Sequence, residues 1–258
     1  MKLTFYKFQG TGNDFVMIDN RQGIFNKDNT KLVAFLCDRK FGIGADGLIL
    51  LEDEPGMDFK MVYYNSDGNQ STMCGNGGRC LVAFAAHLNV VEDKATFNAV
   101  DGLHYATISD DVVSLQMTDV DEVKIKPNAT FLDTGSPHHV QLVANIDDYA
   151  VKTEGAKLRY GIYGEKGSNI NFVEPTADKV FKVRTYERGV EDETLSCGTG
   201  VTAVAIAMHK TGKTADNEIK ISAPGGHLKV KFDVVDEKYT NVHLIGPAKF
   251  VFKGEIDV

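Results

Sequence analysis

The sequence lacks any run of lysine and arginine residues, and its net charge is −8, from 36 acidic and 28 basic residues. A chain without a basic patch is not expected to follow a phosphate backbone, so nucleic acid is disfavoured as a partner. No stretch is apolar enough to cross a lipid bilayer, and the first residues lack the apolar core of a secretory signal. No membrane partner is therefore expected.

Cysteine is also scarce. Four cysteines in 258 residues do not make a disulfide scaffold, so a reducing, cytoplasmic location is the default expectation. Zinc ligands paired at short spacing are missing too, because Cys74 and Cys80 are six residues apart and Cys197 has no cysteine near it. No metal is expected.

A dinucleotide site is disfavoured as well, although residues 42–47 spell its glycine pattern. In dinucleotide-binding folds that pattern follows a strand and opens a helix. Here it follows an expected helix over 29–39 and precedes an expected strand over 48–51. No nucleotide cofactor is therefore expected.

Two short motifs stand out, Cys74-Gly-Asn-Gly and Cys197-Gly-Thr-Gly, and each precedes an apolar run with helical spacing. Each cysteine is therefore expected at the start of a helix. The partial positive charge of a helix N-terminus stabilises a thiolate and can lower a cysteine pKa from about 8.5 to roughly 3.5–7.5. Two such cysteines predict a site with two acid/base sulfurs.

The motifs belong to an internal repeat. Tyr64-Asn-Ser-Asp-Gly leads to the first motif, and Tyr186-Glu-Arg-Gly leads to the second. Beyond each expected helix, residues 96–108 and 219–234 read as a strand, a glycine-containing turn and another strand. The matching order favours duplication, and it places the expected site at the interface of two similar halves.

The rest of the chain favours strands over helices. Besides the helix expected over 29–39, another helix is expected over 151–160. The short connections indicate a mostly antiparallel α+β fold. Other strands are expected over 2–8, 15–19, 48–52, 58–65, 112–118, 169–174, 181–187, 241–246 and 249–256. No low-complexity linker separates the halves, and their boundary is expected between Thr118 and Pro127.

Paired cysteines at helix starts suit proton transfer at carbon. One thiolate removes a proton from one face of a carbon, and the thiol opposite returns a proton to the other face. The motif glycines let backbone N–H groups approach a substrate carboxylate closely. Two rivals remain. Cys74 and Cys197 can form a redox disulfide if they face each other, and a single nucleophilic cysteine with a histidine base would leave the second motif unexplained.

Seven segments together resemble the diaminopimelate epimerase family along essentially the full length. They are Gly10-Thr-Gly-Asn13-Asp-Phe15, Gly42-Ile-Gly-Ala-Asp46-Gly47, Asn65-Ser-Asp-Gly, Met73-Cys-Gly-Asn-Gly-Gly-Arg79, Ser136-Pro-His138, Tyr186-Glu-Arg-Gly189 and Ser196-Cys-Gly-Thr-Gly200. The resemblance implies interconversion of LL- and meso-2,6-diaminopimelate on the route to lysine and peptidoglycan precursor, without a cofactor. It also implies a homodimer.

The family fold implies two pseudo-symmetric halves, each a mixed, mostly antiparallel curved sheet wrapped around a central helix. The last strand returns to the first half in this family, so the halves are expected to be 1–118 with 248–258, and 119–247. The aromatic residues of Phe250-Val-Phe252 are expected in a core strand.

The resemblance assigns roles to individual positions. Cys74 and Cys197 match the catalytic acid/base pair, and Arg188 would bind the distal carboxylate of the substrate. His138, expected in a loop, and Glu187 match positions that tune the cysteines. The positions that match substrate-binding residues are Asn13, Asn65, Gly75, Asn76, Asn169, Glu187, Arg188, Gly198 and Thr199.

Some positions carry alternatives or plainer expectations. Ser136 stands where many family members have asparagine, which keeps a racemase of another amino acid, such as proline or histidine, as a rival. A redox-sensing or binding protein without turnover is a second rival. The acidic residues 191–193 are expected to form a solvated bulge, and Cys37 and Cys80 are expected to pack in the core.

Overall fold

The computed structural model describes residues 2–71, 73–176 and 179–258. The chain divides into two compact units. The N-terminal unit comprises Met1–Leu115 and Gly246–Val258, and the C-terminal unit comprises Gln116–Ile245. No helix within the described ranges has the length and apolar character needed to span a membrane.

The N-terminal unit is a sheet in the order β17-β1-β2-β3-β4-β5-β6-β7. Its β2–β3 and β4–β5 pairs are parallel and its other neighbours are antiparallel. Its strands are β1 (Lys2–Gly10), β2 (Asn13–Asp19), β3 (Gly47–Glu52), β4 (Phe59–Asn65), β5 (Lys94–Ala99), β6 (Gly102–Ser109), β7 (Val112–Gln116) and β17 (Lys249–Asp257). Its helices are α1 (Thr30–Cys37) and α2 (Gly75–His87).

The C-terminal unit repeats this pattern in the order β8-β9-β10-β11-β12-β14-β15-β16. Here β10–β11 and β12–β14 are the parallel pairs. Its strands are β8 (Val123–Lys126), β9 (Ala129–Asp133), β10 (Pro137–Leu142), β11 (Asn169–Pro175), β12 (Val180–Glu187), β13 (Asp192–Thr194), β14 (Glu218–Ala223), β15 (Gly226–Val235) and β16 (Lys238–Pro247). Its helices are η1 (Ile146–Asp148), α3 (Val151–Tyr163) and α4 (Gly198–Lys210).

The two units therefore share one plan. In each, a helix (α1 or α3) makes the first parallel crossover, and a buried helix (α2 or α4) makes the second. The predicted α+β class with two similar halves is confirmed. The additional short strand β13 pairs with β12 and precedes the second cysteine motif.

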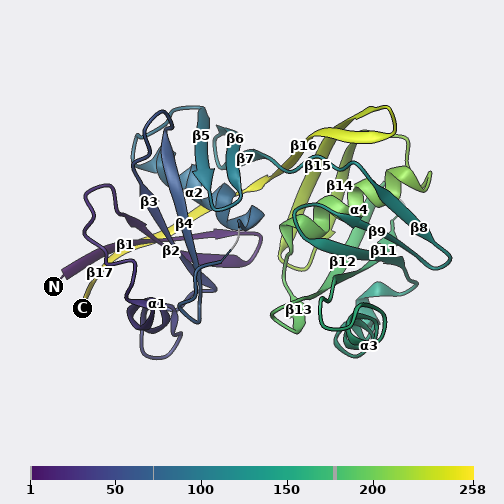
Figure 1. The fold of residues 1–258 in the computed structure, drawn as a ribbon, viewed down its shortest axis with the longest axis horizontal. Helices are drawn as coiled ribbons and strands as arrows, with labels where there is room; N and C mark the ends of the chain where they lie inside the picture. The colour runs from purple at the N-terminus through teal and green to yellow at the C-terminus, as the bar shows by residue number, and fades with distance from the viewer. Residues whose placement is uncertain (1, 72, 177–178) are drawn as a thin grey trace. The chain divides into compact units, whose positions relative to one another are not determined.

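The core of each unit is its central helix. Figure 1 shows the strands of each unit curving around α2 or α4. Leu81 and Phe84 of α2 have no exposed surface, nor have Val204 and Ile206 of α4. Burial of each such side chain contributes about 1.5–3 kcal/mol, so strand contacts on all sides hold these helices in place. The start of each helix is thus a rigid platform.

Two expectations about the strands were wrong. Strands β8, β9, β10 and β13 were not predicted, because β8 alternates over only four residues and the other three are short and lack a clear alternation of polar and apolar residues. Phe250-Val-Phe252 is not a core strand, since these side chains are 43–51% exposed. The ring of Phe250 contacts those of Phe8 and His87, and the ring of Phe252 contacts that of Phe5.

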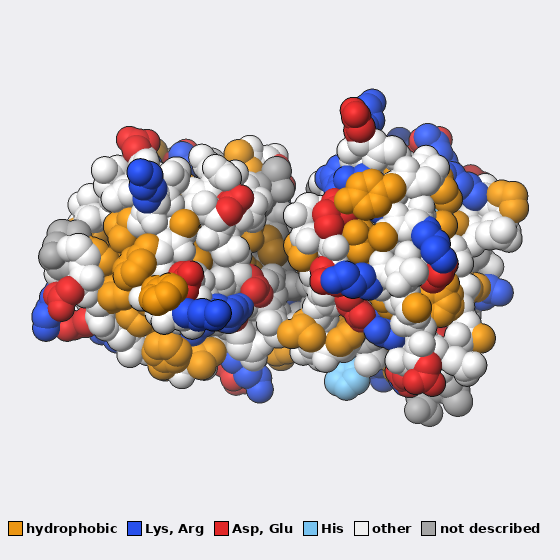
Figure 2. Space-filling view, turned by 90° about the horizontal axis from the view of Figure 1, so that it is seen from below, with side chains coloured by type: hydrophobic (Ala, Val, Ile, Leu, Met, Phe, Trp, Pro, Cys, Tyr) orange, Lys and Arg blue, Asp and Glu red, His pale blue; other side chains and the backbone are white. Residues whose placement is uncertain are grey.

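The charges on the surface are mixed. On the face drawn in Figure 2, acidic and basic side chains lie next to each other rather than in separate areas of one sign. Oppositely charged side chains also pair elsewhere in the chain's described residues, as Lys152 does with Asp192 and Lys182 with Asp147. The net charge of −8 is thus spread over many small clusters.

Candidate active site

Each motif cysteine is the residue that precedes a central helix, as predicted. Cys74 and Cys197 have nearly the same extended backbone, with φ −113° and ψ 121° for the first and φ −110° and ψ 110° for the second. The carbonyl of Cys74 accepts the N–H of Gly78 at 2.7 Å, and that of Cys197 accepts the N–H of Val201 at 2.9 Å. Both thiols therefore lie at the positive end of a helix.

The last glycine of each motif lies in a closely packed place. A Cβ at Gly77 would lie 3.0 Å from Cδ1 of Ile49. A Cβ at Gly200 would lie 2.5 Å from Oδ1 of Asn171 and 3.3 Å from Sγ of Cys197. Glycine thus lets each helix start lie directly against the strand beneath it, β3 in one unit and β11 in the other.

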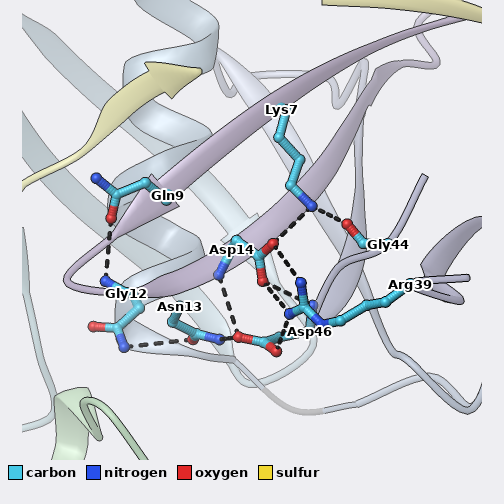
Figure 3. Close-up of polar contacts among 9 residues, drawn as sticks. Lys7, Gln9, Gly12, Asn13, Asp14, Arg39, Gly44 and Asp46 are labelled. Atoms are coloured by element: carbon cyan, nitrogen blue, oxygen red, sulfur yellow. Dashed lines mark hydrogen bonds and ion pairs between the residues drawn. The ribbon is translucent and has the colours of Figure 1, made fainter. Parts of the chain in front are cut away.

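In the N-terminal unit, Asn13 is the contact of Cys74. The Cys74 thiol donates to Oδ1 of Asn13 at 3.6 Å, and Nδ2 of Asn76 donates to the same oxygen at 3.4 Å. Nδ2 of Asn13 donates to Oδ2 of Asp46 at 2.6 Å, as Figure 3 shows. Because Asp46 accepts a hydrogen bond from the amide nitrogen of Asn13, the amide oxygen of Asn13 faces the thiol of Cys74.

A network of charges holds Asp46. Arg39 binds Asp46 at 2.8 Å and Asp14 at 2.6 Å, and Lys7 pairs with Asp14 at 2.7 Å while also donating to the carbonyl of Gly44 (Figure 3). Burial acts to raise the pKa of Asp14, but the hydrogen bonds from Arg39 and Lys7 outweigh it and lower this pKa to about 2. Asp14 and Asp46 both lie in the motifs read from the sequence, yet their part in orienting Asn13 was not foreseen.

Arg79 lies completely buried in the first turns of α2. Its Nη2 donates to Oδ1 of Asn76 at 3.0 Å and to Oγ1 of Thr11 at 3.3 Å, and its Nη1 donates to the carbonyl of Gly75 at 3.4 Å. Burial lowers the pKa of Arg79, and its coulombic interactions with Cys80 and Cys74 act in the opposite direction. Arg79 therefore orients Asn76 and brings a positive charge near Cys74.

Of the other residues predicted in this unit, Gly75 and Asn76 lie buried at the start of α2, next to Cys74. Asn65 is the last residue of β4 and is exposed. Its backbone N–H bonds to the carbonyl of Asn69 at 3.0 Å, which begins the loop that leads to Cys74. The structure brings Asn13, Asn76 and Cys74 together and places Asn65 at the entrance to the same loop.

In the C-terminal unit, Cys197 is buried and lies beside Thr199. Its Sγ is 3.5 Å from Oγ1 of Thr199. Oγ1 of Thr134, from the segment between β9 and β10, donates to the carbonyl of Thr199 at 2.9 Å. Gly198 is buried in the same turn. Thr134, which the sequence analysis missed, thus anchors the start of α4.

Asn169 and Arg188 form a cluster with Ser136. Oδ1 of Asn169 accepts the backbone N–H of Arg188 at 2.9 Å, and Nδ2 of Asn169 donates to Oγ of Ser136 at 3.2 Å. Nη2 of Arg188 donates to the same Oγ at 3.3 Å, and its Nη1 donates to the carbonyl of Lys166 at 3.0 Å. Ser136 therefore bridges the two residues, and the exposed guanidinium of Arg188 keeps further N–H groups suited to a carboxylate.

The expected solvated acidic bulge was wrong. Oε1 of Glu191 accepts from Nε of Arg159 and from the backbone N–H of Gly189, both at 3.1 Å, and its Oε2 accepts from the hydroxyl of Tyr186 at 3.1 Å. Burial acts to raise the pKa of Glu191, but these hydrogen bonds lower it. The carboxylate therefore ties the loop before Cys197 to α3 and β12.

The neighbouring acidic side chains fasten the same loop. Glu193 forms a two-point pair with Arg184, at 2.6 and 2.7 Å, and Asp192 pairs with Lys152. Glu187, the last residue of β12, accepts from the hydroxyl of Thr194 at 2.8 Å. The loop is held on both sides, with Glu187 at its base.

His138 lies in strand β10 and not in a loop, which corrects the expectation. It is completely buried, and Nδ2 of Asn171 lies 3.2 Å from its Nδ1. Burial, and to a lesser degree the charge of Arg188, lower its pKa to about 3. Asn171 is a further residue that the sequence analysis did not identify, since it lies in the middle of an apolar strand.

The remaining cysteines are core residues, as expected. Burial raises the pKa of Cys37 and of Cys80 to about 12, so both stay thiols near neutral pH. All four cysteines are free thiols. Within the described parts of the chain, no three or more histidine, cysteine, aspartate or glutamate side chains gather as a candidate metal site.

Comparison with known proteins supplies the family. The sequence profile named diaminopimelate epimerase matches residues 5–123 and 130–251. The chain is similar to a diaminopimelate epimerase of Flavobacterium psychrophilum, with 64% identity over 258 residues that cover 99% of this chain and 100% of the relative. It is 42% identical to a diaminopimelate epimerase of Chlorobaculum tepidum, over 96% of this chain and 98% of the relative.

Solved structures show the same fold at low identity. A phenazine biosynthesis protein of the PhzF family from Bacillus anthracis matches with a TM-score of 0.80 and 14% identity, over 100% of both chains. A probable proline racemase from Agrobacterium radiobacter matches with a TM-score of 0.70 and 18% identity, over 99% of this chain and 93% of the other. At these identities the match concerns the fold alone.

Proposed function

The chain belongs to the diaminopimelate epimerase family, and we propose that it interconverts LL- and meso-2,6-diaminopimelate in the biosynthesis of lysine and peptidoglycan precursor. The observation that carries this proposal is the pair of cysteines, each at the start of a buried helix, together with the cluster of Ser136, Asn169 and Arg188. No cofactor takes part in the proposed reaction.

The reaction proceeds by two-base proton transfer. The thiolate of one cysteine, Cys74 or Cys197 according to the direction, takes the α-proton, so that a C–H bond breaks and an S–H bond forms. The thiol of the other cysteine gives its proton to the opposite face of the same carbon, which inverts the stereocentre. The protonation states of the two sulfurs are then exchanged, and proton exchange with solvent restores them.

The helix starts supply the electrostatic part of catalysis. Negative charge spreads onto the α-carboxylate as the α-carbon loses its proton. Backbone N–H groups at Gly75, Asn76, Gly198 and Thr199 lie at helix N-termini, where an anion is stabilised without a metal. Within each unit these groups are already in place, because its central helix is fixed in the core.

The polar side chains set the choice of substrate. Arg188 binds the distal carboxylate, and Ser136 holds Arg188 and Asn169 together, a task that fits its hydrogen bonds to both. Asn13, Asn65 and Glu187 bind the polar groups of the substrate, and Glu187 and His138 tune the cysteines. Ser136 in this role needs no direct contact with the substrate.

Location and assembly complete the proposal. We propose a cytoplasmic enzyme that acts on a small amino acid and assembles as a homodimer. Light scattering of the purified protein measures the mass in solution. A mass of two chains of 28.3 kDa supports the dimer, and a single chain at all working concentrations rejects it.

Deuterium incorporation tests the activity. Reduced protein is incubated with LL-diaminopimelate in deuterated water, and the α-carbon is followed by NMR and the isomers by chromatography. Exchange at the α-carbon with formation of the meso isomer is the expected result. No exchange and no meso product would reject the proposal. Parallel incubations with proline and with histidine test whether the protein is instead a racemase of another amino acid. Exchange with only one of these amino acids would identify a racemase of that amino acid.

A further inference from the structure

Three polar side chains are buried side by side beneath the start of α4. Asn171 on β11 and His138 on β10 have no exposed surface, and Thr185 on β12 is only 4% exposed. The three strands are neighbours in the sheet. A Cβ added at Gly200 would lie 2.5 Å from Oδ1 of Asn171 and 3.3 Å from Sγ of Cys197. This cluster therefore lies next to the cysteine.

The hydrogen bonds leave the Asn171 amide one orientation. Its Oδ1 accepts from the hydroxyl of Thr185 at 3.0 Å, and its Nδ2 donates to the carbonyl of His139 at 2.9 Å. A flipped amide would set its oxygen against that carbonyl, and two acceptors repel. Nδ2 must therefore face both the carbonyl and Nδ1 of His138, which is 3.2 Å away.

This orientation fixes the proton on His138. An amide NH₂ only donates, so Nδ1 of His138 must accept, and the proton of a neutral ring then sits on Nε2. Nε2 is buried and has no hydrogen-bond partner among the described residues. A doubly protonated ring would set an N–H against the N–H of Asn171. The low pKa of His138, caused by burial and Arg188, agrees with a neutral ring.

The N-terminal unit shows that the fold does not need this polar cluster. The same strand pairings place Phe15, Ile49 and Tyr63 at the positions of His138, Asn171 and Thr185. Gly77 packs on Ile49 as Gly200 packs on Asn171. Burying His138 and Asn171 where Phe15 and Ile49 suffice costs stability unless every hydrogen bond is made, so the cluster indicates a chemical role.

We propose that Asn171 is a positioning residue that holds His138 in the neutral Nε2–H tautomer, so that His138 serves the reaction as a hydrogen-bond donor and not as a proton acceptor. The group it serves is an anion, either a thiolate or a carboxylate. The catalytic half of this inference rests on the proposed epimerase function, whereas the tautomer itself does not.

Nitrogen-15 NMR tests the tautomer directly. Protein labelled with ¹⁵N-histidine is measured by long-range ¹H–¹⁵N correlation near about pH 7, and His138→Gln identifies the signals of His138. We expect protonated Nε2 and unprotonated Nδ1 in the unaltered chain. Protonated Nδ1, or a doubly protonated ring, would overturn the proposal.

Asn171→Asp tests the positioning role. An ionised carboxylate there accepts from Nδ1–H of His138, so this nitrogen carries the proton and kcat falls by about 10²-fold, while KM changes by less than about threefold. One carboxylate oxygen also faces the carbonyl of His139, so urea unfolding checks that the variant is folded under the assay conditions. The matched control is Gln141→Glu, which puts a carboxylate beside Nε2 of His139, where Oε1 of Gln141 now lies at 3.2 Å. This control changes the signals of His139 and leaves kcat unaltered.

The outcomes separate the two proposals. A moved proton in Asn171→Asp with unchanged kcat overturns the catalytic role of the tautomer. An equal loss of kcat in Gln141→Glu overturns it as well, because the effect would then be one of charge alone. A protein that epimerises no amino acid rejects the proposed function, and the NMR of the unaltered chain still decides the tautomer.

Discussion

The two cysteines begin equivalent helices in equivalent sheets, yet their surroundings differ. Cys74 is half-buried and donates to the amide oxygen of Asn13, which a network of charged side chains turns toward it. Cys197 is buried, lies beside the hydroxyl of Thr199, and adjoins the neutral cluster around Asn171. The two units thus share the same backbone pairing, while the side chains beneath the two sulfurs differ.

The central helices repeat this contrast. Arg79 of α2 and Thr202 of α4 occupy the same place relative to their cysteines, and both are completely buried. Arg79 carries a charge to the start of its helix, whereas the hydroxyl of Thr202 donates to the carbonyl of Gly198 at 3.1 Å and adds none. A buried cation therefore lies near the start of α2, and a neutral hydroxyl stands at the same place in α4.

The largest expected effect comes from removing either sulfur. Cys74→Ala and Cys197→Ala should each lower the epimerisation rate by about 10³-fold or more, because one face of the α-carbon loses its proton carrier. Each variant keeps one base and should still exchange the α-proton of one epimer with solvent, without inversion. The two variants should differ in which epimer they exchange, as deuterium NMR of the separated isomers would show.

Cys80→Ala is the control for these variants, since Cys80 is a buried thiol with a pKa raised to about 12 by its burial. It should lose stability but keep the epimerisation rate. Exchange of the same epimer by both Cys74→Ala and Cys197→Ala would contradict the assignment of the sulfurs to opposite faces.

The charged helix should matter more than the neutral one. Arg79→Met is expected to lower kcat/KM by about 10²-fold, because Asn76 loses the donor that orients it and the positive charge near Cys74 disappears. Thr202→Val, at the same place in the other unit, should change kcat/KM by less than about threefold. Steady-state kinetics measures both, and equal losses would show that the contrast between the helices has no part in catalysis.

The positions of the two cysteines could be predicted from the sequence, because the start of a helix is determined by residues close together in the chain. Glycine after each cysteine and an apolar run of helical period were sufficient to predict Cys74 and Cys197 as the residues before α2 and α4. Strand β10 and its buried His138 were missed, because Pro137-His-His carries no alternation of polar and apolar residues. What makes these residues a strand is pairing with β9 and β11, which comes from distant sequence.

The side-chain network was missed for a similar reason. Asp46 and Asn13 are far apart in the chain and meet only because β2 pairs with β3 in a parallel register. The acidic segment after Glu187 read as a solvated bulge, since its partner Arg159 lies on α3. Single side chains could be assigned by motif, whereas their orientation depends on contacts that the sequence does not show.

The orienting network of the N-terminal unit should have a moderate effect. Asp46→Asn replaces an acceptor with an amide that can present its NH₂ to Nδ2 of Asn13, so Asn13 no longer turns its oxygen reliably to Cys74. We expect a loss of about tenfold in kcat with a nearly unchanged melting temperature, since Asp46 is exposed. Asp19→Asn is the control, because it breaks a surface pair with Arg21 at the other end of β2. A matching loss in that control would mean that the effect is not specific to Asn13.

The smallest expected effect is on stability, and it concerns the neutral cluster of the C-terminal unit. His138 is neutral when folded, with a pKa lowered to about 3 by its burial, but it binds a proton in the unfolded chain below its ordinary pKa of 6.5. Over this range the unfolded state binds more protons than the folded state. The free energy of unfolding therefore falls as the pH drops from 6.5 toward 3, by about 2 kcal/mol between about pH 7 and about pH 5.

His138→Gln removes this titration and leaves the other acidic and basic groups in place. Urea unfolding of both proteins at the two pH values should therefore show a steeper loss of stability in the unaltered chain, by that same amount. Phe15, the counterpart of His138 in the N-terminal unit, has no titrating group, so Phe15→Leu should leave the pH dependence unchanged while lowering stability at both pH values. An equal pH dependence in the unaltered chain and in His138→Gln would show that His138 takes up a proton in the folded protein, and the contrast between a charged and a neutral half would fail at this position.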